Sequence, residues 1–254
     1  MELSVVTPVY SEEESLVELV NYCHNNILDH LFEIIIIYHP NSSKKCIKII
    51  NNLDSEFDRV VARPQNLDGN GGNGSAYIQG FNLVRGSHIL MIDSDGEMDN
   101  NTIPVLIKSL IENSYDMVIG SRYVKGGGFV GYPLHKYILN ASYHLLFRIL
   151  YNTHIKDLTC GFKIFTREVL NRYNFEAKFQ DIGAETTLKP LKGGYKISEI
   201  GTIWTGKKGR KNSLSVLGNL RYLFLALKIL LRGWNVNVDL PCLRKMHYYE
   251  EINT

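Results

Sequence analysis

The 254-residue sequence lacks an excess of charge of either sign and lacks a paired cysteine motif. Its 28 Lys and Arg residues nearly balance 26 Asp and Glu residues, for a formal net charge of +2. This balance argues against a nucleic-acid-binding protein, which needs a strongly basic surface. The four cysteines, Cys23, Cys46, Cys160 and Cys242, include no C-x-x-C pair. Free thiols in a reducing compartment are therefore expected, rather than disulfides or a zinc site.

Long hydrophobic runs are also missing, and a secretory leader is not expected. The N-terminal MELSVVTPVYSEEE has a short apolar run but no basic segment, so it is predicted to form a first strand and not a signal peptide. The most apolar helical stretch, 214–233, is interrupted by Arg221, Lys228 and Arg232. It falls short of the roughly 20 apolar residues that span a bilayer. We expect a cytoplasmic location, either free or peripheral at the cytoplasmic face of the membrane.

Strand and helix patterns alternate through the first half of the chain. With 44% apolar residues, the chain is long enough to bury one large core. Ser11 and Glu14 form a capping-box pattern before the first helix. The alternation predicts an α/β fold, an open and mostly parallel sheet with helices on both faces. Strands are predicted at 3–10, 32–39, 58–63, 88–93 and 115–123, and another at 195–205.

A glycine-rich loop lies between the third strand and the third helix. Gly69, Gly71 and Gly74 follow the spacing G-x-G-x-x-G, and Asp93 comes nineteen residues later. This spacing is typical of a dinucleotide-binding turn, so a dinucleotide-dependent oxidoreductase is one hypothesis. Against it, the loop does not follow the first strand, and residues 64–68 separate it from the strand before it. The glycines would instead let the backbone pass close to a ligand and supply turns with positive φ.

Two carboxylates follow the fourth predicted strand. In HILMIDSDGEMD, Asp93 and Asp95 flank Ser94 where the strand ends. This is the carboxyl edge of the sheet, where open α/β folds bind ligands. Carboxylate oxygens suit Mg²⁺ or Mn²⁺, which one or two carboxylates hold together with diphosphate oxygens. The structural alternative is a solvated turn that caps the next helix.

Seven segments, in order, resemble the family 2 inverting glycosyltransferases with a GT-A fold. They extend from residue 3 to about 225 and are most similar to the branch of dolichyl-phosphate mannose synthases and polyprenyl-phosphate glycosyltransferases. The segments are VVTPVYSEEESL, the glycine loop with GSAYIQGF, ILMIDSDGEMD, DMVIGSRYVKGGG, KDLTCGFKIFTREVL, GAETTLKPLKGGYKISEIG and GKKGRKNSLSVLGNLRYLF.

The resemblance implies a domain organisation and an activity. A GT-A domain at 1–212 would comprise a nucleotide-sugar-binding half (1–123) and an acceptor half (124–212). An amphipathic helix and a polar tail would follow at 213–254. The implied activity is metal-dependent, inverting transfer of a sugar from a nucleotide diphosphate sugar donor to a lipid-phosphate or glycan acceptor.

The resemblance also implies the roles of individual residues. Asp93 and Asp95 would face the Mg²⁺ or Mn²⁺ ion and the donor diphosphate. Arg122 would bind a donor or acceptor phosphate, for which its planar guanidinium is suited; a surface ion pair is the structural alternative. A basic loop would close over a phosphate, or stay a solvated charged loop. Donor binding is implied for Pro8, Tyr10, Glu12, Gly74 and Ser94, and the basic loop contains Lys207, Lys208, Arg210 and Lys211.

One segment departs from the family pattern. Relatives usually end the second strand with two acids, of which the first reads the base, whereas this strand ends in Tyr38-His39. Base recognition would then depend on backbone groups, on Asn41 or Ser42, or on stacking over Tyr38. The nucleotide stays open, and so does the hypothesis of a catalytically degenerate nucleotide-sugar-binding protein.

The catalytic requirement depends on the acceptor. A sugar hydroxyl needs a carboxylate base, for which Asp157, Asp181 and Glu185 are the candidates, with Asp157 first. A lipid phosphate is already ionised and needs a base less. Each of these acids has a structural alternative, as a helix cap or as a partner of Lys163 or Arg167.

The apolar helix predicted at 214–233 bears on partners. At 100° per residue, Arg221, Lys228 and Arg232 lie within about 40° of one another and form a narrow basic stripe. Such a helix is suited to a membrane interface with anionic lipid. Packing on the sheet, or on a second subunit in a homo-oligomer, is the alternative.

Overall fold

The computed structural model describes residues 1–67, 71–207 and 216–231. Gly69, Lys208, Arg210, Lys211 and the polar C-terminal tail lie outside the described residues, so the predictions made for them are not developed further.

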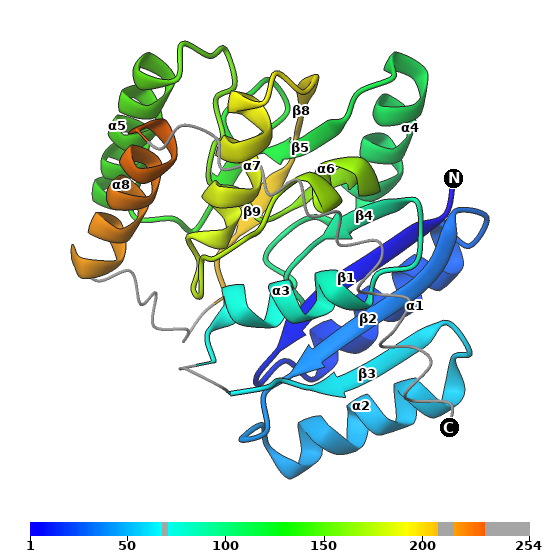
Figure 1. The fold of residues 1–254 in the computed structure, drawn as a ribbon. Coiled ribbons are helices and arrows are strands. Elements are labelled where there is room, and N and C mark those ends of the chain that lie inside the picture. Colours follow the sequence, from blue (N-terminus) through cyan, green and yellow to red (C-terminus); the bar gives the residue numbers. More distant parts are fainter. Residues whose placement is uncertain (68–70, 208–215, 232–254) are drawn as a thin grey trace.

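A seven-stranded mixed sheet forms the centre of the molecule (Figure 1). Its strand order is β3-β2-β1-β4-β7-β5-β8. β7 is antiparallel to both of its neighbours, β4 and β5, while the other pairs are parallel. A second sheet pairs β6 with β9. The predicted α/β fold with a mostly parallel sheet is therefore confirmed. The strands are β1 (Leu3–Val9), β2 (Leu31–Tyr38), β3 (Val60–Pro64), β4 (His88–Met91), β5 (Met117–Ser121), β6 (Gly128–Val130), β7 (Lys163–Thr166), β8 (Ile197–Gly201) and β9 (Ile203–Thr205).

Helices cover both faces of the sheet (Figure 1). α3 and α7 lie together in front of the sheet, and α1 and α4 lie behind it. The predicted alternation of strands and helices up to residue 123 is confirmed. The helices are α1 (Glu14–Asn26), α2 (Lys44–Glu56), α3 (Asn73–Leu83), the 3₁₀ turn η1 (Asn100–Thr102), α4 (Ile103–Asn113), α5 (Leu134–Leu150), α6 (Arg167–Arg172), α7 (Ile182–Lys192) and α8 (Val216–Leu231).

Apolar strands explain the core. Four consecutive isoleucines of β2, 34–37, are at most 1% exposed because helices cover both faces of the strand. Cys23, Cys46 and Cys160 are buried free thiols, as predicted for these three. They contribute to the core as small apolar side chains.

Two details differ from the sequence-based prediction. The segment predicted as one strand at 195–205 forms two, β8 and β9, in different sheets. Buried Thr202 separates them, because its N–H donates to the Ser121 carbonyl and its hydroxyl bonds Thr102. The predicted capping box is wrong, since no side chain caps α1. Instead the Glu12 carboxylate turns back and accepts the N–H groups of residues 10 and 11.

α5 and α8 stand side by side beyond α7, at one edge of the molecule (Figure 1). The Tyr151 hydroxyl, just after α5, donates to the Ala226 carbonyl of α8 at 2.7 Å. Lys192 of α7 donates to two carbonyls at the end of α8, where a cation is favourable. α8 therefore packs on helices, and the predicted packing on the sheet is wrong.

Two cations of the basic stripe predicted for this helix are exposed and contact neighbouring side chains. The Arg221 guanidinium lies 4.1 Å from the centroid of the Phe179 ring, and Lys228 pairs with Glu176. Because both side chains remain exposed, membrane contact through them stays a prediction, and Arg232 lies outside the described residues. Among the helices of the described ranges, none combines the length and the apolar character needed to cross a bilayer.

Candidate active site

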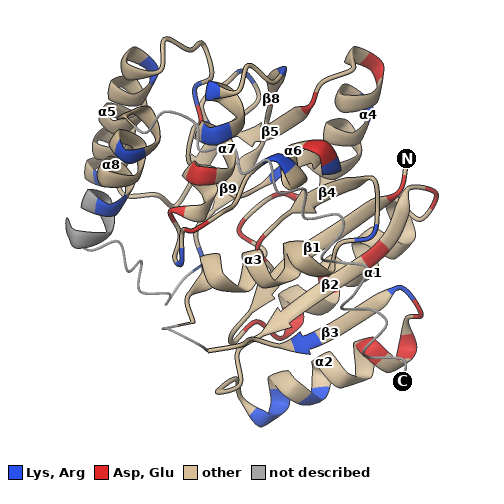
Figure 2. Ribbon diagram, in the orientation of Figure 1, with Lys and Arg blue, Asp and Glu red and all other residues tan. Residues whose placement is uncertain are grey.

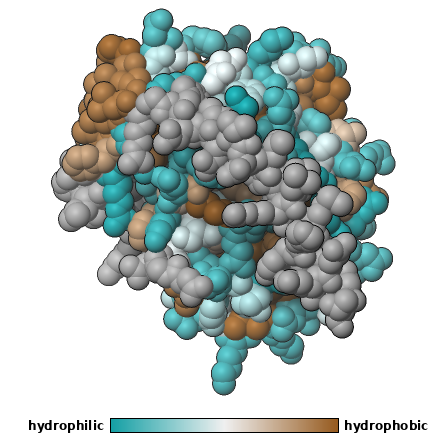
Figure 3. Space-filling view, viewed as in Figure 1, coloured by the Kyte–Doolittle hydropathy of each residue, from teal (hydrophilic) through white to brown (hydrophobic). Residues whose placement is uncertain are grey.

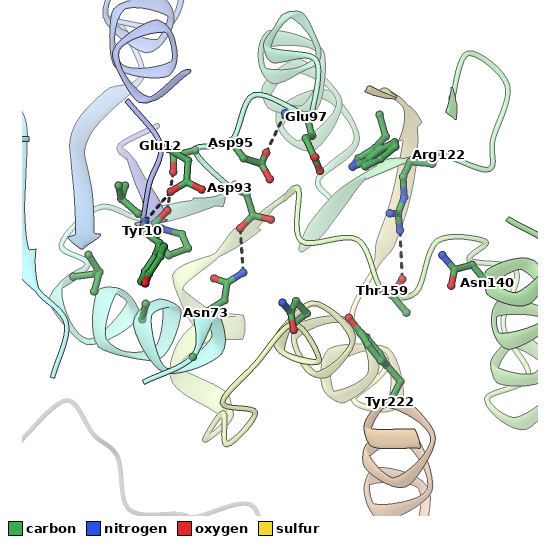
Figure 4. Close-up of a pocket in the computed structure, with 18 of the residues that line it drawn as sticks. Tyr10, Glu12, Asn73, Asp93, Asp95, Glu97, Arg122, Asn140, Thr159 and Tyr222 are labelled. Carbon is green, nitrogen blue, oxygen red and sulfur yellow. Dashed lines mark hydrogen bonds between the residues drawn. The ribbon is translucent and has the colours of Figure 1, made fainter. Parts of the chain in front are cut away.

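A pocket of about 500 Å³ opens at the carboxyl ends of β1, β4 and β5 (Figure 4). One wall is acidic and the opposite wall contains Arg122 and residues of α5 and α8. Figure 4 shows Tyr10, Glu12, Asn73, Asp93 and Asp95 on the first wall, and Arg122, Asn140, Thr159 and Tyr222 on the second.

The turn after β4 builds the acidic wall. The Ser94 hydroxyl donates to the Pro8 carbonyl at 2.8 Å and ties this turn to the end of β1. Asp95 accepts the Glu97 N–H at 3.0 Å. Gly96 between them has φ +67°, a conformation that glycine adopts without strain. The turn thus presents Asp93 and Asp95 to the same pocket, as predicted.

Two side chains of α3 contact the Asp93 carboxylate. The buried Tyr77 hydroxyl donates to Asp93 Oδ1 at 2.8 Å, and the Asn73 amide lies 3.4 Å from the same oxygen. Burial, reinforced by neighbouring Asp95, raises the pKa of Asp93 to about 6. A bound cation would relieve both effects, because it favours the ionised carboxylate.

The carboxylates are suited to a cation that shares its ligands with a substrate. Within the described ranges, no three His, Cys, Asp or Glu side chains are placed to hold a metal ion together. Mg²⁺ and Mn²⁺ sites that use one or two carboxylates are completed by phosphate oxygens. Asp93 and Asp95 fit this second kind of site.

A buried ion pair builds the opposite wall. Arg122 follows β5, and its Nε and Nη2 donate to the two oxygens of Asp157 at 2.7 and 2.8 Å. The Arg122 backbone N–H adds a third bond to Asp157, and Thr159 lies 3.4 Å from Nη2. Burial opposes ionisation of Asp157, but the guanidinium outweighs it and lowers the pKa of Asp157 to about 2. The pair fixes the plane of the guanidinium at the edge of the pocket.

His144 of α5 completes this wall. Its Nδ1 accepts the Leu158 N–H at 3.2 Å, and its Nε2 lies 3.7 Å from Asp157. Burial lowers the pKa of His144 to about 4, so the ring is neutral at pH 7 and carries its proton on Nε2, toward Asp157. A helix at the edge of the molecule is thereby joined to the arginine of the pocket.

Comparison with known proteins shows the family of this chain. Residues 4–173 match the model of glycosyl transferase family 2. The chain belongs to this family. Its fold also resembles a solved member of the GT-A class, glucosyl-3-phosphoglycerate synthase of Mycobacterium tuberculosis, with a TM-score of 0.67 over 92% of this chain and 82% of that one at 16% identity. That synthase has been solved with Mn²⁺, UDP-glucose and phosphoglyceric acid.

Two curated relatives share more sequence. A dolichol-phosphate mannosyltransferase of Pyrococcus furiosus is 31% identical over 173 residues, 67% of this chain and 47% of the relative. A dolichyl-phosphate beta-glucosyltransferase of Trichomonas vaginalis is 31% identical over 227 residues, 84% of this chain and 68% of the relative. The chain therefore spans about half the length of the first relative and about two thirds of the second.

Family membership replaces the oxidoreductase hypothesis, and the structure gives the glycine loop another role. Neither Gly71, Gly72 nor Gly74 has positive φ, so that prediction is wrong for these three. Gly74 does not line the pocket. A Cβ there would lie 2.2 Å from the Ala177 carbonyl oxygen, because α3 begins directly against the 177–179 segment.

Tyr38, one of the groups suggested for base recognition, does not line the pocket. Tyr38 packs against the core, and Asn41 and Ser42 also lie outside the pocket lining. Successive strand residues point to opposite faces, so His39 reaches the pocket instead. Its ring meets the exposed Tyr10 ring edge-on at 5.0 Å. These two rings, beside Pro8 and Glu12, form the surface on which a base could lie.

The three candidate bases have different surroundings. Asp157 and Glu185 are fully buried and do not line the pocket. Glu185 accepts the N–H groups of residues 176 and 177 and pairs with Lys189 at 2.6 Å. Asp181 accepts the Phe179 N–H at the start of α7 and does not line the pocket either. The structure thus gives all three acids positioning contacts, and the general-base role stays a prediction for each of them.

Lys207 lies over the acidic turn, outside the pocket lining. A Cβ added to Gly96 would come 2.9 Å from its Nζ. The ammonium group is therefore close to the turn that carries Asp95, and its predicted contact with a donor phosphate stays a prediction.

Sequence reasoning missed several residues that line or support the pocket. Asn73 and Tyr77 are four residues apart at the start of α3, a spacing that places both on one helix face, and this signal was available. His39 was recognised only as a departure from the family. The residues that α5 and α8 contribute gave no motif; they are Lys136, Asn140, Tyr143, His144, Phe147 and Tyr222.

Proposed function

We propose that this chain transfers a sugar from a nucleoside diphosphate sugar to the phosphate of a polyprenyl phosphate, with the help of Mg²⁺ or Mn²⁺. The observation that carries the proposal is the opposition, in one pocket, of the Asp93 and Asp95 carboxylates to the fixed guanidinium of Arg122. An acidic wall suits a cation with its diphosphate, and a cationic wall suits an anionic acceptor.

The donor would lie on the acidic wall. Asp93 and Asp95 would hold the cation, while Tyr10 and His39 would bind the base. The cation supplies Lewis acidity that neutralises charge on the leaving diphosphate. The mycobacterial synthase of the same fold was solved with Mn²⁺ and UDP-glucose, which supports a nucleotide sugar and a divalent cation as ligands.

The acceptor would approach from the opposite wall. Arg122 and Lys136 are the cations there, and Tyr222 faces the same space (Figure 4). Inversion requires the nucleophile to enter opposite the leaving diphosphate, which two opposed walls allow. A phosphate needs no general base, in keeping with the buried contacts that occupy Asp157 and Glu185.

An apolar surface beside the pocket supports a lipid acceptor. α5 is mostly uncharged (Figure 2), and apolar side chains gather over it (Figure 3). Outward-facing residues of α5 and α8 that exceed half of their full exposure are Leu134, Ile138, Leu145, Ile149, Phe224 and Leu231. An exposed apolar patch next to a pocket marks an interaction surface. We propose that this surface contacts the membrane by burial of its apolar side chains.

Transfer from labelled UDP-, GDP- and dTDP-sugars to farnesyl phosphate, with and without Mn²⁺, tests the proposal. We expect transfer with one nucleotide, dependent on metal and abolished by Asp95→Asn, while the exposed α4 control Glu112→Gln keeps full activity. Metal-dependent binding of a nucleotide sugar without transfer to any acceptor would instead indicate a degenerate, non-catalytic protein. Transfer to a glycan and not to the prenyl phosphate would direct attention to Asp181 as base.

A further inference from the structure

A second cavity lies behind Arg122. Its volume is about 400 Å³, within the range of small-molecule sites. Aromatic rings between the end of β5 and the first turn of α5 dominate its lining, so we call it the aromatic cavity. It is lined by Arg122, Tyr123, Val124, Gly127, Gly128, Phe129, Tyr132, Leu134 and Tyr137.

The aromatic cavity and the active-site pocket share Arg122 and Tyr132. The centre of the Arg122 guanidinium lies 5.4 Å from the Phe129 ring and 6.0 Å from the Tyr123 ring, at cation–π distance. One side of Arg122 thus faces the active-site pocket while its plane rests on the rings of the aromatic cavity. A group bonded to a phosphate at Arg122 would be within reach of this cavity.

The lining of the aromatic cavity suits hydrocarbon. Among the described residues that line it, none is a carboxylate or an amide, and its polar side chains are the Arg122 guanidinium and three tyrosines. Ring faces together with Val124 and Leu134 offer apolar contact, which isoprene units would match.

The cavity also opens toward the apolar surface of α5. Tyr137 is 39% and Leu134 72% exposed, and Ile138 follows on the same helix at 58%. A continuous apolar path therefore leads from Arg122, past Tyr137, to the surface proposed above to contact the membrane.

We propose that the aromatic cavity binds the first isoprene units of the acceptor, next to the phosphate held by Arg122. The inference rests on the proposed function and adds to it a subsite that binds the hydrocarbon chain of the acceptor directly. A phosphate ester places its first carbon one oxygen away from phosphorus, so the lipid must begin beside Arg122. The aromatic cavity is the apolar space available there.

Soluble acceptors of increasing length test the subsite without any membrane. With dimethylallyl, geranyl and farnesyl phosphate, which carry one, two and three isoprene units, the KM of the wild-type protein should fall as units are added. Tyr137→Ala should raise the KM for farnesyl phosphate about tenfold, equivalent to 1.4 kcal/mol. It should leave kcat and the inhibition constant of inorganic phosphate unchanged. Tyr137→Phe, which keeps the ring, should restore the wild-type KM.

Leu134→Ala serves as a second variant, and Ile111→Ala on α4 is the matched exposed control. If KM falls with chain length equally in the wild type, Tyr137→Ala and Leu134→Ala, the subsite is refuted while the proposed function stands. If Tyr137→Ala weakens inhibition by inorganic phosphate as much as it raises KM, the ring only positions Arg122, and the subsite is again refuted. If the wild type uses none of the three prenyl phosphates, the proposed acceptor itself fails.

Discussion

Replacement of Asp157 by asparagine distinguishes a positioning residue from a general base. Asparagine keeps the volume of the side chain but removes the charge that faces Arg122, whose side chain is only 15% exposed. The fall in the pKa of Asp157 from its ordinary 3.8 to about 2 corresponds to about 2.5 kcal/mol of folding free energy. We therefore expect Asp157→Asn to lower the free energy of unfolding by about 2.5 kcal/mol and the melting temperature by about 5–10 °C.

The pH dependence carries the same signature. Because the pKa of Asp157 is lower in the folded protein, its contribution is fully present above about pH 4 and is lost as pH falls through about 2. The wild type should lose its advantage over Asp157→Asn in that interval. Urea denaturation at pH 7 and at pH 2–4 measures both free energies, with Glu112→Gln as the control, for which we expect a change below about 0.5 kcal/mol.

Binding completes the test. When the Asp157 carboxylate no longer fixes its plane, the Arg122 guanidinium should bind phosphate more weakly. Inorganic phosphate should therefore inhibit Asp157→Asn less well than the wild type. The reasoning would be refuted if stability and phosphate inhibition were unchanged while kcat fell by a factor of about 100 or more, since that pattern is the mark of a lost general base.

Three further changes test the packing and the acidic wall. Gly74→Ala brings a methyl group to 2.2 Å from the Ala177 carbonyl oxygen; we expect a loss of about 1–3 kcal/mol in thermal unfolding, and an unchanged melting temperature would contradict the close approach. Tyr77→Phe removes one hydrogen bond to Asp93, so the Mn²⁺ concentration for half-maximal activity should rise about tenfold, as a bond to a charged group implies, with the circular dichroism spectrum unchanged. Because the pKa of Asp93 is about 6, a proton competes with the cation below that pH, and titration calorimetry should show Mn²⁺ affinity falling from pH 7 to pH 5.

The parts of the site predicted from sequence lie at the ends of strongly apolar strands. The four residues before Asp93 are fully buried, and such a strand can end only where polar residues begin, which fixes the position of Asp93 and Asp95. Arg122 follows a strand of the same kind. Local pattern was sufficient there because strand and turn follow directly from neighbouring residues.

The parts that could not be predicted depend on contacts between distant segments. Asp157 lies 35 residues from Arg122, and they meet because β7 is inserted antiparallel between β4 and β5. No local sequence pattern predicts the insertion of β7. That His39 and not Tyr38 lines the pocket depends on the register of β2, because a shift by one residue turns a strand side chain to the other face.

α5 links the two properties that a lipid-phosphate acceptor requires. Its inward residues Lys136, Asn140 and His144 recur every four positions and line the pocket, while Ile138 and Ile149 face outward and are 58% and 70% exposed. A helix with four-residue spacing presents a single face to the phosphate site, so the remaining face is free to be apolar. An acceptor with a charged head and a hydrocarbon tail would meet both faces of the same helix. A glycan acceptor would contact only the inward face. The apolar side chains of the outward face would then stay exposed to water, which is unfavourable, whereas a lipid would bury them.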